Sequence, residues 1–240
     1  MPDPVDGLDG ISVVIRGNFN PSIFSPAWLL EQDLIGKGEF TEASVEVITQ
    51  ELAIFKCVWL GVQATYDGLV LSADSMEYAE QVRDVAVGAL RTLSHTPVGG
   101  LGVNRHTHMT ADDSTVWHKV GDTLAPKDIW DEILSYPGLR TMSVWGARPD
   151  SLSGRVAIQV EPSLRVPNGI FVQVNDHYNL IESKGPAETR DDAIWQINAG
   201  DVLEPSATKI DLVVQILTDG WNASLDQAER AFRTIGALTR

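Results

Sequence analysis

The sequence has a single cysteine, no excess of basic residues and no long apolar run, and each absence excludes a class of protein. Cys57 cannot form a disulfide within the chain, and one thiolate cannot build a cysteine metal cluster. Its apolar surroundings in the sequence predict a small buried side chain. No window approaches the roughly 18 consecutive apolar residues of a membrane span. The start, 1–6, lacks the basic and apolar parts of a signal peptide, so we expect a cytoplasmic protein.

The charge of the chain narrows the choice of partner. Its 240 residues include 33 acidic and 18 basic side chains, a formal net charge of −15. Nucleic acids and anionic membranes carry charge of the same sign, so neither is expected as a partner, whereas a basic protein would be attracted. The hydrophobic content of 43% predicts one globular domain, 1–240, with a sizeable core.

Local patterns predict strands followed by a long helix in the first half of the chain. The expected elements are a strand at 11–16, a helix that begins at Ser25-Pro26, strands within 44–71 with a hairpin turn at Asp67-Gly68, and a helix over 74–93. The run 52–60 is apolar on both alternating sides, which predicts a central strand covered on both faces. Asp74 with Glu77 has the spacing of a capping box at the start of the long helix.

The second half repeats this order. Its expected elements are a strand at 101–109, short helices at 114–120 and 126–134, strands at 139–145, 155–161 and 169–178, and helices at 191–198, 206–221 and 224–238. The segment 206–221 also suits a strand because of its β-branched residues, and Ser224 with Gln227 predicts the cap of the last helix. The order predicts an α+β fold, with a mainly antiparallel sheet and helices on one face. It suggests a two-fold internal repeat of halves 11–112 and 113–240 that share the sheet.

The strand expected at 101–109 contains the sharpest candidate for a functional site. Alternation places Asn104, His106 and His108 on one face, opposite Val103 and its neighbours. Two adjacent imidazoles can supply two ligands to a divalent metal. A third ligand could come from Asp112, Asp113, His118 or the segment 175–177. The alternative is a pair of histidines on a polar sheet face that bind no metal.

The segment Asn175-Asp176-His177-Tyr178 ends a predicted strand and contains residue types used in general acid–base catalysis. If that strand lies beside 101–109, a polar cluster forms. The members of this candidate polar cluster are Asn104, His106, His108, Asp112, Asn175, Asp176 and His177. No HExxH motif, no Gly-x-Ser-x-Gly elbow and no complete phosphate loop occurs, so we assign no catalytic residue.

Seven tryptophans is a high number for this chain, and most lie on inferred apolar faces. Trp195 and Trp221 lie where the helical periodicity is weakest. Exposed tryptophans are frequent anchors of protein interfaces, so these two residues are candidates for an interface.

Four motifs resemble a sporadically distributed family of uncharacterised bacterial proteins of about this length. They are Phe19-Asn-Pro with Phe24-Ser-Pro-Ala-Trp28-Leu29, Gly102-Val-Asn-Arg-His-Thr-His108, Val174-Asn-Asp-His-Tyr178, and the closing helix Ser224-Leu-Asp-Gln-Ala-Glu-Arg-Ala-Phe232. The resemblance implies a bacterial cytosolic protein from an accessory or defence-type locus, and it implies no catalytic residue.

Three hypotheses of function follow from the sequence. The first is a non-catalytic acidic component that binds a protein partner or self-associates, without a cofactor. The second is a metal-dependent hydrolase that uses His106 and His108. The third is a small-ligand binding protein with a large apolar cavity between the sheet and the helices.

Overall fold

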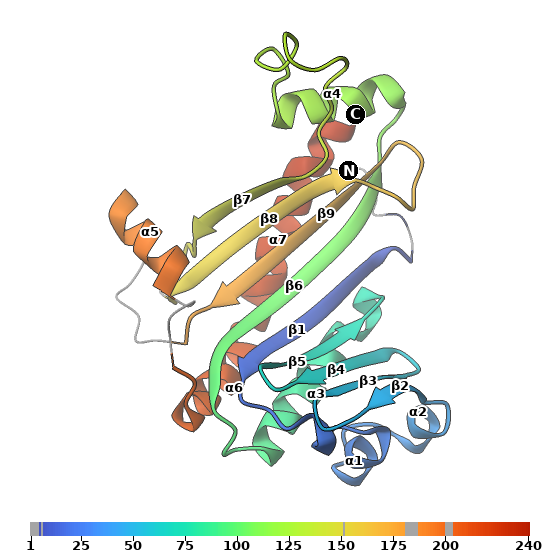
Figure 1. Ribbon diagram of the computed structural model, residues 1–240, viewed down its shortest axis with the longest axis vertical. Helices are drawn as coiled ribbons and strands as arrows, with labels where there is room; N and C mark the ends of the chain where they lie inside the picture. The colour runs from blue at the N-terminus through green and yellow to red at the C-terminus, as the bar shows by residue number, and fades with distance from the viewer. Residues whose placement is uncertain (1–4, 6, 151, 181–186, 200–203) are drawn as a thin grey trace.

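The computed structural model describes residues 5, 7–150, 152–180, 187–199 and 204–240 and has an α+β fold (Figure 1). The strands are β1 (Asp9–Gly17), β2 (Ser44–Ile48), β3 (Leu52–Cys57), β4 (Leu60–Thr65), β5 (Gly68–Ala73), β6 (Val98–Thr110), β7 (Met142–Ala147), β8 (Gly154–Pro162) and β9 (Gly169–Tyr178). The helices are α1 (Pro26–Glu31), α2 (Lys37–Thr41), α3 (Ala79–Thr92), α4 (Ser114–Leu124), α5 (Arg190–Ala199), α6 (Ile210–Asp219) and α7 (Trp221–Gly236). Short 3₁₀ helices are η1 (Pro21–Ile23), η2 (Met76–Tyr78), η4 (Ala207–Lys209) and η5 (Ala237–Thr239).

Within the described residues, nine strands form one antiparallel sheet in the order β2-β3-β4-β5-β1-β6-β9-β8-β7. Strands β1 and β6 pair near the centre, and β6 pairs on its other side with β9, which joins 11–112 to 113–240. Runs of hairpins flank the β1–β6 pair on both sides: β2 to β5 ends on β1, and β7 to β9 ends on β6. The predicted half 11–112 thus contains six strands and 113–240 contains three of the described strands, and the two-fold internal repeat stays a prediction.

The helices α3 and α7 cover one face of the sheet, and α5 packs against β7 and β8. Helix α3 packs on β1 and β5, and α7 packs on β6 and β9, behind the strands in Figure 1. The strand side chains that point to these helices alternate with polar ones; Ile11, Val13 and Ile15 of β1 are buried, whereas Ser12 is half-buried on the other face. Burial of such alternate apolar positions fixes the register of the strands, because a slip by one residue would expose them.

The run 52–60 is not the central strand that its apolar character predicts. It forms β3, a tight turn at Val58-Trp59 and the first residue of β4, and β3 is second from the edge of the sheet. Val58 has a φ of 52° in this turn. The turn has neither glycine nor asparagine, so its sequence gives no signal of a hairpin.

The helix starts agree only in part with the predicted caps. The Ser25 hydroxyl accepts the Trp28 N–H at 3.1 Å, which confirms the predicted start of α1. Ser75, rather than Asp74, caps the turn η2 that precedes α3. Within the segment 206–221, η4 and α6 are helical and no β-strand forms. Helix α7 follows after Gly220 alone, so Ser224 lies inside α7 and does not cap it.

One predicted helix is absent. Residues 126–134 form a succession of turns rather than a helix, although the N–H of Leu134 reaches the carbonyl of Trp130 at 2.8 Å. In the part of the chain that the structure describes, no helix combines the length and the apolar character needed to cross a membrane.

Candidate functional site

The sheet divides the predicted polar cluster between its two faces. Asn104 lies opposite Asn175, His106 opposite Gln173, and His177 opposite Gly102. The members on the face without α3 and α7 are Asn104, His106, His108, Asn175 and His177. Asp176 points to the helix face, because it alternates with its two neighbours in β9. Asp112 lies beyond the end of β6, where its N–H donates to the carbonyl of Thr239. The seven predicted residues therefore do not form one site.

The two histidines of β6 are packed into the polar face of the sheet. The His106 ring lies over Gly10 of β1, and both imidazoles are tilted against Phe171 of β9, at centroid distances of 5.8 and 5.1 Å. Nδ1 of His108 is 2.7 Å from Oγ of Ser163. Burial lowers the pKa of both imidazoles below the usual value. The packing and the lowered pKa values favour the neutral form of both rings.

The metal hypothesis needs a third ligand beside this pair. Among the described residues, no group of three or more His, Cys, Asp or Glu side chains is arranged to hold a metal ion. The carboxylate of Asp113 caps α4 by accepting the N–H of Val116 at 2.9 Å. His118 contacts the neighbouring Trp117 ring edge to face, at 4.9 Å between centroids.

Asp176 instead belongs to a buried ion pair that the sequence did not reveal. The guanidinium of Arg148, in the loop after β7, pairs with Asp176, bonds to Asp150 at 2.6 Å and lies 3.7 Å from the Tyr178 ring centroid. Tyr178 donates a hydrogen bond to Asp176 at 3.0 Å. Burial raises the pKa of Asp176, and the positive charge of Arg148 opposes that rise. The sequence predicts only a turn at 148–150, because pairing across the fold leaves no local signal.

The predicted interface tryptophans have different environments. Trp221 is only 2% exposed, packed in the core beneath α3, with the Arg83 guanidinium 5.8 Å from its ring centroid. This corrects the expectation of an exposed anchor, because α6 and α7 meet almost without a linker and turn the ring inward. Trp195 of α5 is exposed, and its role in an interface stays a prediction.

A different stretch exposes large apolar side chains. In the segment 129–136, which we call the apolar segment, Ile129 and Ile133 are 72% and 73% exposed, and Trp130, Leu134 and Tyr136 are exposed as well. The sequence pattern there predicts a helix packed on the core, so this surface was missed. The three acidic residues among these side chains, Asp128, Asp131 and Glu132, were the available signal of a solvent-facing stretch.

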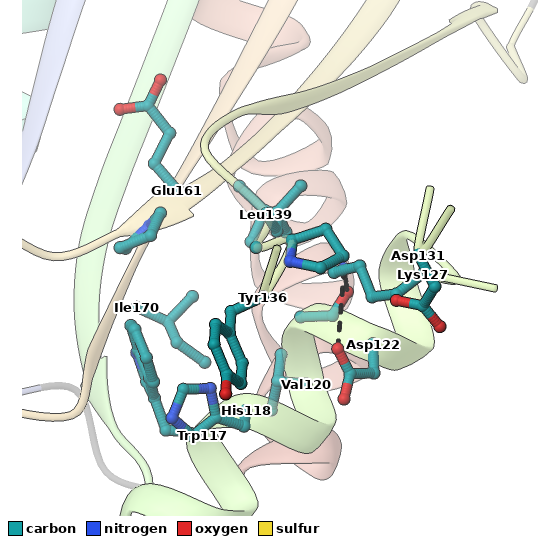
Figure 2. Close-up of a pocket in the computed structure, with 15 residues that line it drawn as sticks. Trp117, His118, Val120, Asp122, Lys127, Asp131, Tyr136, Leu139, Glu161 and Ile170 are labelled. Carbon is teal, nitrogen blue, oxygen red and sulfur yellow. Dashed lines mark hydrogen bonds and ion pairs between the residues drawn. The ribbon is translucent and has the colours of Figure 1, made fainter. Parts of the chain in front are cut away.

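A pocket of about 400 Å³ lies beside the apolar segment, between α4, the segment 127–139 and the adjoining ends of β8 and β9. Figure 2 shows Trp117, His118 and Tyr136 gathered on one side and Asp122, Lys127 and Asp131 on the other. It lies at one end of the sheet, and not between the sheet and its helices, where the small-ligand hypothesis expected a cavity.

The charged side chains of the pocket differ in how many hydrogen bonds and ion pairs they form within the protein. Nζ of Lys127 donates to the carbonyls of Gly121, at 2.9 Å, and Ala125, at the C-terminal end of α4, and lies 3.6 Å from Asp122. The carboxylate of Glu161 points away from the other lining side chains and accepts a hydrogen bond from Thr141 (Figure 2). In the described part of the chain, no group donates a hydrogen bond to the carboxylate of Asp131.

The chain matches no protein-family model, and no curated protein sequence is significantly similar to it.

Proposed function

We propose that the protein is a non-catalytic binding component that docks a basic protein partner on the apolar segment. The carrying observation is the exposure of Ile129, Trp130, Ile133, Leu134 and Tyr136 within a stretch of eight residues. Soluble monomers rarely expose contiguous apolar patches of several hundred Å² outside a functional surface. Burial of such side chains against a partner contributes about 25 cal/mol per Å² of apolar area.

The charge around the segment supports a basic partner over a second copy of the chain. Asp128, Asp131 and Glu132 are interleaved with the apolar side chains, and residues 128–139 include no Lys or Arg. A two-fold dimer through this segment would bring the same carboxylates together from both copies. Their repulsion disfavours that contact, whereas a basic protein gains from each carboxylate and from the net charge of −15.

Photo-crosslinking in cells of the source organism tests this proposal. A benzoylphenylalanine side chain in place of Trp130 should form, on irradiation, an adduct with one protein of basic surface, identified by mass spectrometry. The double variant Ile133→Ser, Leu134→Ser should lose that adduct, because it removes apolar contact area from the interface. Both substituted side chains are exposed, so the melting temperature should stay close to that of the parent.

The matched control places the same crosslinker at Val45, an exposed apolar residue of β2 at the edge of the sheet opposite β7. It should not give the adduct. The proposal is wrong if position 130 yields no adduct, yields only a crosslinked dimer of the chain, or yields an adduct that the serine variants retain.

A further inference from the structure

The walls of the pocket beside the apolar segment suit an apolar stem, such as the methylene groups of a long side chain. Val120 and Ile170 are buried at its base, and Leu139 closes one side. The indole of Trp117 is held in place, because its Nε1 donates to the carbonyl of Gly169 at 3.0 Å. An aromatic ring in a fixed position can pack on the methylene groups of a long side chain and attract a cation at its end.

The charges of the pocket favour a positive group at its mouth. Of the three side chains on the charged side, Asp122 and Asp131 are carboxylates, and Lys127 is the single cation. The hydrogens of that ammonium are directed to the carbonyls of α4. An entering anion would therefore meet two carboxylates and an ammonium that is already bonded, whereas an entering cation would meet the free carboxylate of Asp131.

We propose that this pocket is a binding site for a basic side chain, a guanidinium or ammonium on an apolar stem, supplied by the protein partner. The stem lies against Trp117, Val120 and Ile170, and the cation at its end is held by Asp131 on the opposite side of the pocket. The inference rests on the function proposed above, and it adds the residue type that anchors the partner. A neutral side chain of the same shape gains the apolar contact alone.

Small-molecule probes test the pocket without the partner. N-acetyl-arginine methylamide should shift the indole N–H resonance of Trp117, assigned with the Trp117→Phe variant, in a saturable manner. The citrulline analogue, a neutral isostere, should bind about three- to tenfold more weakly. The Asp131→Asn variant should weaken the arginine probe by a similar factor. The matched Asp128→Asn variant, which removes a nearby carboxylate outside the pocket lining, should leave the affinity unchanged.

A second variant fills the pocket without altering its charge. A Cβ atom at Gly121 would lie 3.6 Å from Cβ of Leu139, an ordinary contact, so Gly121→Leu should fold and should remove binding of both probes. Equal affinity for arginine and citrulline, or an unchanged affinity in Asp131→Asn, overturns the cation site.

The two proposals fail separately. If the crosslink from position 130 forms and the probes do not bind, the docking surface stands and the cation site is wrong. If the arginine probe binds as described and the crosslink fails, the pocket has another ligand and the docking surface is wrong.

Discussion

The imidazole of His106 lies directly against the backbone of Gly10 in the neighbouring strand. A Cβ atom at Gly10 would be 2.5 Å from Cε1 of His106 and 2.9 Å from the carbonyl oxygen of Ala73. The two residues are paired across β1 and β6. The ring occupies the space that a side chain at Gly10 would need, so the glycine and the histidine depend on each other.

Substitution Gly10→Ala should therefore destabilise the protein by about 1–3 kcal/mol, because the added methyl group displaces the His106 ring and meets a backbone oxygen. Urea unfolding measures this change. Gly38 in α2 has no atom within 4 Å of an added Cβ, so Gly38→Ala is the matched control and should be neutral or slightly stabilising. Equal stability of the two variants would contradict the packing role of His106.

The free energy of unfolding should rise as the pH rises toward about 6.5, the ordinary pKa of histidine. Burial lowers the pKa of His106 and of His108, and this outweighs the attraction of Asp74 and Asp9 for a proton on His106. In this range the unfolded chain binds more protons at these two positions than the folded protein does, so acid favours unfolding. Urea midpoints across the range measure the slope. The double variant His106→Gln, His108→Gln should flatten this slope. An unchanged slope would refute the assignment of the pH dependence to these two histidines.

Removal of only one partner of the Arg148–Asp176 ion pair should strongly lower the free energy of unfolding. Arg148→Met leaves the carboxylate of Asp176 buried without its cation, and we expect a loss of about 3–5 kcal/mol. The double variant Arg148→Met, Asp176→Leu removes both charges and should recover a large part of the loss. Lys56→Met breaks an exposed pair with Asp74 and should cost less than about 1 kcal/mol. A small effect of Arg148→Met in urea unfolding would show that the pair is not closed in solution.

The thiol of Cys57 should be unreactive in the folded protein. Its side chain is fully buried in β3, and burial raises the pKa of the thiol to about 11, helped by the negative charge of Glu39. At pH 8 only about one thiol in a thousand is then ionised. Reaction with a chromogenic disulfide reagent should be slow in buffer and fast in urea. Rapid reaction without denaturant would show that β3 opens readily.

The sequence alone determined which side chains share a face. Alternation in β6 places Asn104, His106 and His108 together, and the structure has them on one face. The caps of α1 and α4 were equally local, because a hydroxyl or carboxylate bonds to an N–H three residues later. Grouped strands and helices were sufficient to predict an α+β fold with one antiparallel sheet.

Only the tertiary structure decided what each face meets. The helical spacing of 126–134 predicts a buried stripe, but the segment forms turns at one end of the sheet and its large apolar side chains are exposed. Trp221 is buried because α3 covers it, and Asp176 is separated from His106 because the two lie on opposite faces of the sheet. Periodicity is a property of neighbouring residues, whereas burial and ion pairing depend on contacts between distant parts of the chain.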